Sequence, residues 1–218
     1  MARSLAVFLF ILIIVPLVSA QAPETVRLSG GGTFEVIRYH NPPPGADVKN
    51  RIRGLRSVVI APVAVVIDSE TLTELIGLIR ERTGWRVLTP GEFIRAATQL
   101  VESSYTETGL TEEELDAVAR RVGQKLEADA AILIRHGVGE VKVQALPLLL
   151  IHRIEQTGVL RLRLVAVSPE VVLWSQRMDY RITVRGVISF PQLPPASEVA
   201  AVSLRRMVER FLSEAWHP

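Results

Sequence analysis

Cysteine is absent from this chain of 218 residues. Without disulfides the hydrophobic core alone has to hold the fold, and without cysteine no lipid can be attached to that residue type behind a secretion signal. A large excess of one charge is also absent, because 25 lysines and arginines face 23 aspartates and glutamates, a formal net charge of +2. This balance gives no general attraction to nucleic acid, so we expect no nucleic-acid partner.

Patterns of known catalytic and metal sites are missing as well. The sequence has no His-Glu-x-x-His, no Gly-x-Ser-x-Gly and no dinucleotide-binding glycine fingerprint. The histidines lie far apart along the chain, at His40, His136, His152 and His217. His136 and Glu140 fall on one side of a predicted strand, but no third metal ligand accompanies them. We therefore expect no enzyme activity, no cofactor and no metal; a hydrolase that uses dispersed residues is the alternative.

The first twenty residues have the features of a cleavable secretion signal. Arg3 supplies a positive start, Leu5–Val15 is apolar, and Val18–Ala20 offers small residues to a signal peptidase. The apolar run before Pro16 is shorter than the roughly 20 residues of a membrane span. We predict a signal peptide over residues 1–20 and a periplasmic or secreted mature protein, with an uncleaved anchor as the alternative.

Processing after Ala20 can be tested directly. Exported protein is expected to begin at Gln21, because signal peptidase reads the small residues just before that bond. The measurement is an intact mass of protein recovered from the exporting cell. A mature chain that still carries Met1 would identify the segment as an anchor.

The remaining chain divides into a lead-in over residues 21–54 and one domain over residues 55–216. The lead-in is rich in glycine and proline, with a flexible Gly30–Gly32 and a stiff Pro42–Pro44 on either side of a β-prone stretch. The domain opens with a valine-rich apolar run, Arg56–Ile67, which is typical of a strand buried on both faces.

Apolar residues at helical spacing predict three helices after that strand, with a short strand at Trp85–Leu88 between the first and the second. Ser69 is expected to cap the first helix and Gly84 to end it. The second and third helices begin with capping boxes, in which a Glu follows a Thr by three residues, at Thr89–Glu92 and Thr111–Glu114.

The second half of the domain reads as strands and a last helix. Ala130–Val143 is a long strand, and Leu160–Val167 and Val171–Val184 alternate in polarity as an antiparallel hairpin does. The apolar positions of the last strand are Val172, Trp174, Met178, Tyr180, Ile182 and Val184, interrupted by Gln176. Ser197 is expected to cap the final helix. This order predicts an α/β fold, a mixed sheet with helices packed on it, ending in an antiparallel hairpin and a C-terminal helix, with its first two strands parallel.

Four segments carry a resemblance to known proteins: Val59–Pro62, Gly84–Thr89, Leu126–Leu133 and Val171–Ser175. Through them the chain resembles the small α/β domain of bacterial envelope proteins. These are the curli-secretion-channel lipoprotein, the N-terminal domain of the Tol–Pal translocation protein and the lipoprotein activators of penicillin-binding proteins. The resemblance covers roughly residues 55–184 and the final helix. It implies partner binding in the cell envelope without enzyme chemistry.

Arginines gather on the polar face of the predicted hairpin. If Val167 pairs with Val171, Arg161 lies directly opposite Arg177, and Arg163 is diagonal to Arg177. Like charges at such positions repel one another, so this basic cluster is suited to an acidic partner such as a wall polymer or an anionic protein surface. A solvated face that discourages edge aggregation is the alternative.

Apolar residues lie on the same face near the hairpin turn, at Val165, Val167, Val171 and Leu173. They need a cover, and we expect the lead-in strand Thr33–Tyr39 to provide it in preference to a partner.

A second apolar stretch, Ala145–Ile151, falls where a loop between two strands is expected. Leu146, Leu148 and Leu149 are candidates for docking to a membrane surface or to another copy of the chain; folding back into the core is the alternative. Together these features indicate a non-catalytic periplasmic or secreted accessory or adaptor protein that binds another cell-envelope component.

Overall fold

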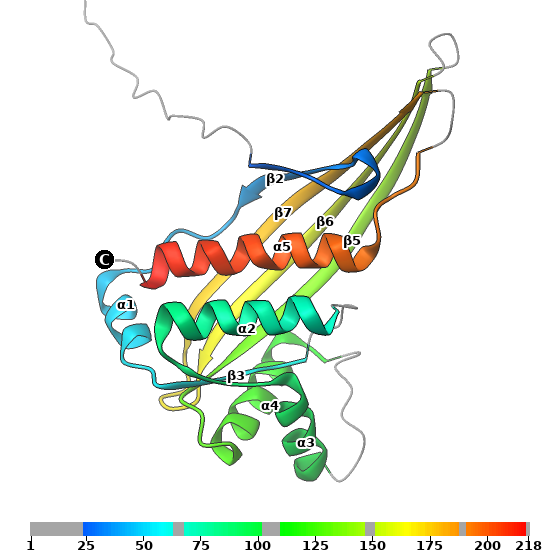
Figure 1. Cartoon of the computed structure of the whole chain (residues 1–218). Helices are drawn as coiled ribbons and strands as arrows, with labels where there is room; N and C mark the ends of the chain where they lie inside the picture. Colours follow the sequence, from blue (N-terminus) through cyan, green and yellow to red (C-terminus); the bar gives the residue numbers. More distant parts are fainter. Residues whose placement is uncertain (1–23, 63–67, 102–109, 147–150, 188–190, 217–218) are drawn as a thin grey trace, which may run out of the picture.

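The chain folds around one mixed sheet of seven strands (Figure 1). This computed structural model describes residues 24–62, 68–101, 110–146, 151–187 and 191–216. The strands are β1 (Thr25–Arg27), β2 (Thr33–Tyr39), β3 (Ser57–Ile60), β4 (Arg86–Leu88), β5 (Ala130–Leu146), β6 (Ile151–Ala166) and β7 (Val172–Val187). Their order is β1-β2-β7-β6-β5-β3-β4; β3 is parallel to β4 and β5, and the other pairs are antiparallel. The predicted fold class and the parallel pairing of β3 with β4 are confirmed.

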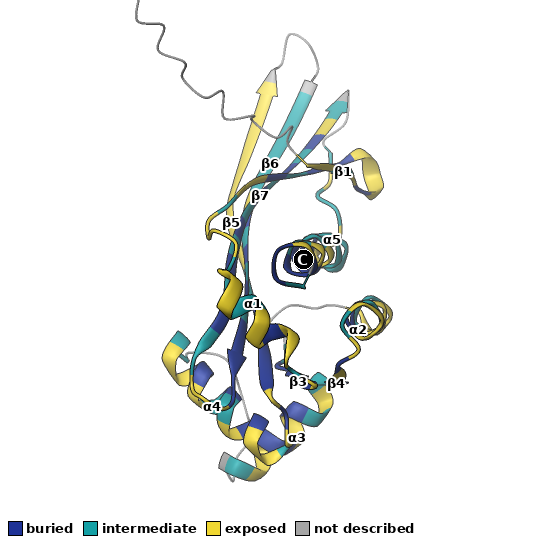
Figure 2. Cartoon of the chain, turned by 90° about the vertical axis from the view of Figure 1, so that its left-hand side faces the viewer, coloured by how far each residue is buried: buried dark blue, intermediate teal, exposed yellow. Residues whose placement is uncertain are grey.

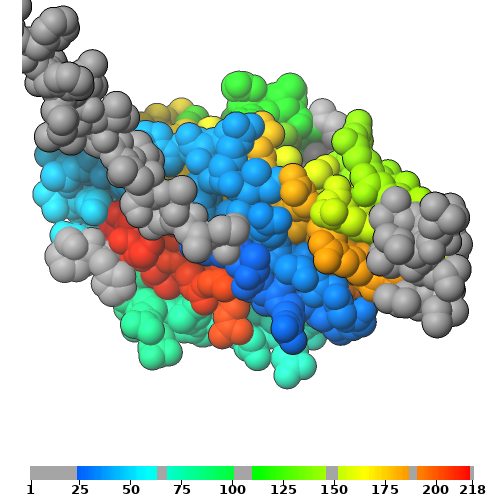
Figure 3. All heavy atoms as spheres, turned by 90° about the horizontal axis from the view of Figure 1, so that it is seen from above, coloured from blue at the N-terminus to red at the C-terminus, as the bar shows by residue number. Residues whose placement is uncertain are grey.

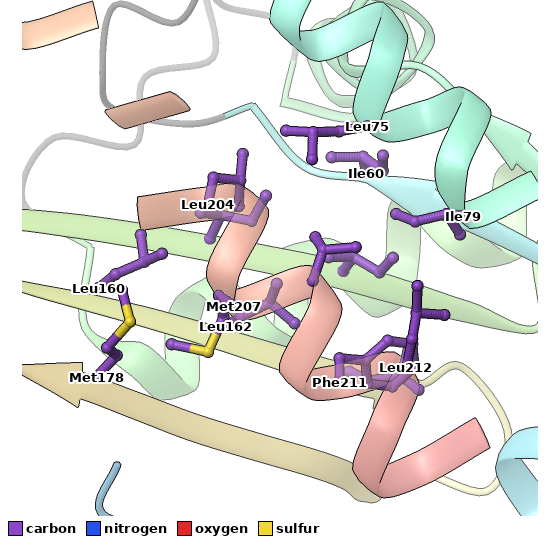
Figure 4. Close-up of a cluster of buried hydrophobic side chains, with 14 of the residues drawn as sticks. Ile60, Leu75, Ile79, Leu160, Leu162, Met178, Leu204, Met207, Phe211 and Leu212 are labelled. Carbon is purple, nitrogen blue, oxygen red and sulfur yellow. The ribbon is translucent and has the colours of Figure 1, made fainter. Parts of the chain in front are cut away.

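Helices cover both faces of the sheet (Figure 2). They are α1 (Ala46–Arg53), α2 (Ser69–Thr83), α3 (Pro90–Val101), α4 (Glu112–Lys125) and α5 (Ala196–Phe211), the last continued by a π-helical turn, η3 (Leu212–Trp216). On one face, α2 and α5 pack on a large apolar cluster that includes Ile60, Leu162 and Phe211 (Figure 4). On the other face, α3 and α4 bury a smaller cluster around Phe93 and Leu115.

The residues of the expected lead-in belong to this domain where the structure describes them. β2 pairs with β7 as a strand of the sheet, and β1 follows it at the edge. Phe34 and Ile52 are fully buried in the large cluster. The turn η1 (Ser29–Gly31) reaches α5, where the backbone N–H of Ser29 donates to Glu198 over 2.7 Å. Figure 3 shows this N-terminal hairpin lying beside α5 and β7.

The helix ends follow local capping chemistry. Asp68 caps α2, one residue before the predicted Ser69, because its carboxylate accepts the N–H of Thr71 over 2.7 Å. Gly84 ends that helix in the left-handed conformation, as predicted, and both predicted capping boxes are present. The predicted cap at Ser197 is wrong. Helix α5 begins at Ala196 after a proline and has no side-chain cap.

Strand β7 carries the predicted buried face, with one correction. Trp174, Met178, Tyr180, Ile182 and Val184 are all buried in the cluster beneath α5. Val172 was predicted on that face and instead packs against the cluster on the α3–α4 side. Leu164 pairs with Trp174 but Val165 pairs with Val172, so β7 holds one extra residue at this point. Such a β-bulge reverses the alternation of side chains.

Val165 and Val167 have an internal cover, but a different one from that expected. The strand Thr33–Tyr39 pairs edge to edge with β7 and does not lie over them. Helix α4 covers them instead, with Val165 in its cluster and Val167 so close that a Cβ on Gly123 would overlap it. Glycine thus allows the close approach of helix and strand.

Gln176 interrupts the apolar alternation of β7 because its side-chain amide forms hydrogen bonds with the segment that follows β2. Its side-chain oxygen accepts the backbone N–H groups of His40, over 3.1 Å, and Asn41, over 2.9 Å. Its Nε2 donates to the carbonyl oxygen of Asn41 over 2.8 Å. A fully buried amide is stable there because both of its ends are satisfied.

The strands β5, β6 and β7 run well past α2 and α5 (Figure 1). We call this extension the arm: residues 137–146 of β5, 151–158 of β6 and 180–187 of β7. A loop was expected from about residue 144 to residue 156, but most of these residues lie in the arm. Of the predicted docking leucines, Leu146 is the last residue of β5, and Leu148 and Leu149 lie outside the described residues. Their docking role stays a prediction.

Candidate functional site

Three arginines form a row across the middle of the sheet. Arg161 of β6 pairs directly with Arg135 of β5 on one side and with Arg177 of β7 on the other. The predicted opposition of Arg161 and Arg177 is therefore confirmed, and Arg135 extends the row to a third strand. Directly opposed residues share a face, which here is the face that α3 and α4 cover only in part.

Helix α4 supplies carboxylates to this row. Glu112 forms an ion pair with Arg161 and lies 3.3 Å from Arg163, whose other nitrogen lies 2.7 Å from Asp116. Burial raises the pKa of Asp116, and Arg163 acts in the opposite direction. The side chain of Arg163 is 18% exposed, against 42% for Arg161 and 38% for Arg177. Arg163 thus holds the helix on the sheet, while Arg161 and Arg177 keep open surface.

One carboxylate, that of Asp179, contacts three basic groups two residues further along β7. The oxygens of Asp179 lie 2.7 Å from His40 Nε2, 3.0 Å from Arg177 Nε and 3.2 Å from Arg38 Nε. Burial acts to raise the pKa of Asp179, but hydrogen bonds from these three groups outweigh it and lower the pKa. One negative charge does not neutralise the two arginines, so this part of the face stays positive.

The same face remains basic along the arm. Besides Arg86 and Arg163, at the end that α3 and α4 cover, the strand register places nine basic side chains on it: Arg27, Arg38, Arg135, Lys142, Arg153, Arg161, Arg177, Arg181 and Arg185. We call this set the basic face. Its described carboxylates are Glu35, Glu112, Glu140, Glu155 and Asp179, with Glu140 counted because it lies 3.6 Å from Lys142. Nine positive and five negative charges leave an excess of four, although the whole chain carries only +2. Positive charge is therefore concentrated on this one open surface.

His136 is part of the core packing beneath the arm. Its Nε2 lies 2.5 Å from the hydroxyl of Tyr180, and its ring stacks on the Tyr180 ring with centroids 5.7 Å apart. Burial lowers the pKa of His136 and raises that of Tyr180. The described residues contain no group of three or more His, Asp or Glu side chains that could hold a metal ion. His136 therefore has a structural partner in Tyr180.

No helix among the described residues combines the length and the apolar character needed to cross a membrane.

The basic face could not be identified in full from the sequence. The alternation of Leu160–Val167 showed Arg161 and Arg163, but Glu112 and Asp116 are distant in sequence and reach the sheet only through the packing of α4. Arg135 and Arg38 belong to strands whose neighbours are decided by the sheet order. A further signal was that basic residues recur at every fourth position of β7, at Arg177, Arg181 and Arg185, which places them on one face.

No model of a known protein family matches the chain, and no curated protein matches its sequence. Several solved structures are similar to it. The LpoB C-terminal domain from Salmonella enterica has 11% identity and a TM-score of 0.37, covering 61% of this chain and 92% of that one. Lipoprotein GNA1162 from Neisseria meningitidis has 15% identity and a TM-score of 0.40, covering 72% and 99%. The PelC dodecamer from Paraburkholderia phytofirmans has 15% identity and a TM-score of 0.37, covering 86% and 99%. The resemblance to bacterial envelope lipoproteins that the sequence indicated is thus found among solved structures, as an overall similarity that says nothing about a partner or an activity.

Proposed function

We propose that this chain is a non-catalytic accessory protein of the bacterial cell envelope, and that its basic face binds an acidic surface of another envelope protein. The observation that carries the proposal is the excess of four positive charges on one open face of a nearly neutral chain. The secretion-type N-terminal sequence is the reason for placing it in the envelope.

The chemistry of the face suits carboxylates. Arginine presents a planar fork of donors that matches a carboxylate in a bidentate way, and Arg161 and Arg177 stand side by side on neighbouring strands. The hydrogen bonds of the sheet hold the backbones of both arginines in place, so these backbones lose little further conformational entropy when a partner binds. Positive charge gathered on one surface also steers an acidic partner toward it before contact.

Neutralising part of the basic face should weaken binding without unfolding the protein. Arg181→Gln with Arg185→Gln removes two positive charges that form no ion pair with the described residues, so the free energy of unfolding should change by about 0.5 kcal/mol or less. Affinity for the acidic partner is expected to fall by about tenfold, since each exposed charge pair is worth about 0.2–1 kcal/mol. The binding measurement needs low salt, because screening would hide the difference.

The partner can be sought by photocrosslinking in the native cell. A photoreactive residue at position 183, between the two arginines on β7, is compared with one at Ile94, which is 41% exposed on α3. A protein captured at 183 and absent at 94, whose capture falls in the double glutamine variant, supports the proposal. Equal capture at both positions, or capture of wall polymer alone, contradicts it. Turnover of generic ester or glycoside substrates by the purified protein would instead favour the hydrolase alternative.

A further inference from the structure

The outer edge of β5 is unpaired over most of its length. β3 pairs with β5 only at residues 130–132, and β5 then continues to Leu146. In the described part of the chain, no strand pairs with the remaining edge. All residues from 137 to 145 are exposed. A row of free backbone N–H and C=O groups at such an edge is a template for another strand.

Valines make this edge apolar on one face. Val138 pairs with Gly158 and Val141 with Gln156, so two residues of β5, Gly139 and Glu140, stand opposite one residue of β6. This bulge brings Val138 onto the same face as Val141 and Val143. Their exposed fractions are 63%, 50% and 57%, and they are three of the five exposed large apolar residues of the described chain. Edge strands are ordinarily protected by charge, so three valines on this one call for a partner.

The edge is complementary to itself. In an antiparallel pair of two β5 strands centred on Val141, each Glu140 stands directly opposite Lys142 of the other copy. Glu140 and Lys142 are on the same face, because their charged atoms lie 3.6 Å apart within one chain. Two equivalent ion pairs therefore form on one face, and the Val141 and Val143 side chains of both copies meet on the other. The two-fold axis makes the interface isologous, so the pairing closes at two copies.

We infer that two copies of this chain pair along the outer edge of β5, in the register centred on Val141, to form one continuous sheet. A second copy is the occupant to which the charges point, because Glu140 and Lys142 of one chain stand opposite Lys142 and Glu140 of the other when the two strands run antiparallel. The inference is independent of the acidic partner, since pairing leaves the arginine row of each copy in the middle of its own sheet.

The absence of cysteine makes a disulfide test possible. Directly opposed residues of an antiparallel pair have Cα atoms about 4.5–5.5 Å apart, within the range that a disulfide spans. Val141→Cys is therefore expected to give a disulfide-linked dimer under mild oxidation. Ile94→Cys, with comparable exposure on α3, is expected to stay monomeric. Equal crosslinking of the two variants would overturn the inference.

A charge swap tests the register in the reduced protein. Lys142→Glu places like charges opposite each other and is expected to raise the dimer dissociation constant by about tenfold, measured by analytical ultracentrifugation. Glu140→Lys combined with Lys142→Glu restores both ion pairs and is expected to return the constant to near the wild-type value. A double variant as weak as the single one overturns the register. Wild-type protein that stays monomeric up to about 100 μM overturns the pairing itself.

Discussion

Replacing Trp174 by alanine is expected to lower the free energy of unfolding by about 3–5 kcal/mol. The side chain is only 3% exposed, on the face of β7 that lies beneath α5. Its ring meets the ring of Phe211 with centroids 5.1 Å apart and an angle of 69° between the planes. Removing it leaves a cavity between the sheet and the helix, where the Trp174 ring of β7 meets the Phe211 ring of α5. A loss of this size is comparable to the whole stability of many domains.

The measurement is a urea titration followed by circular dichroism, with two comparison variants. Trp174→Phe keeps a ring against Phe211 and removes an indole N–H that has no hydrogen-bond partner among the described residues, so a clearly smaller loss is expected. Ile94→Ala changes an exposed side chain and should alter stability by about 0.5 kcal/mol or less. A Trp174→Ala loss below about 1 kcal/mol would contradict the burial of this residue.

Gly158→Val is expected to cost about 3 kcal/mol. Gly158 of β6 lies next to Tyr180 of β7, and the Tyr180 ring lies across the backbone of this glycine, so that a Cβ there would overlap the ring. The ring is held in place from both sides: it stacks on Phe34 at 5.0 Å between centroids and on His136 at 5.7 Å. Any side chain at position 158 must therefore displace a buried tyrosine and break its contact with His136.

A matched glycine on the neighbouring strand provides the control. Gly137 of β5 has open space where a Cβ would be placed, so Gly137→Ala is expected to be neutral or slightly stabilising. The cause can be isolated by combining Gly158→Ala with Tyr180→Leu, since the loss from Gly158→Ala should shrink once the ring is gone. Additive losses in the double variant would show that the overlap with Tyr180 is not the cause.

Local chemistry made several elements predictable from the sequence. The Thr89–Glu92 and Thr111–Glu114 capping boxes and the glycine at 84 act within a few residues of the chain, so they determine helix ends before any tertiary contact forms. The predicted hairpin register is correct from the Leu164–Trp174 pair to the far end, but the predicted pairing of Val167 with Val171 is wrong, because Val165 pairs with Val172. The extra residue of the β7 bulge restores the predicted pairs beyond it. Alternation of polar and apolar residues places one set of side chains of these strands on the core.

Other features were decided only by the tertiary structure. Val172 changed face because a bulge adds one residue to β7, and the residue types do not mark that bulge. The lead-in belongs to the sheet because β2 pairs with the free edge of β7. Gln176 can be buried because the segment that follows β2 turns against it and forms hydrogen bonds with its amide.

For the candidate site, the alternation of the sequence placed Arg161 and Arg177 on one face of a single hairpin, whereas their direct opposition also depends on the extra residue of the β7 bulge. It did not determine what surrounds them. Glu112 reaches Arg161 from a helix 49 residues away, and Arg38 reaches Asp179 from a strand 141 residues away. Charges so distant in sequence come together only when the sheet order and the helix packing are complete. The concentration of positive charge on one face is therefore a property of the fold.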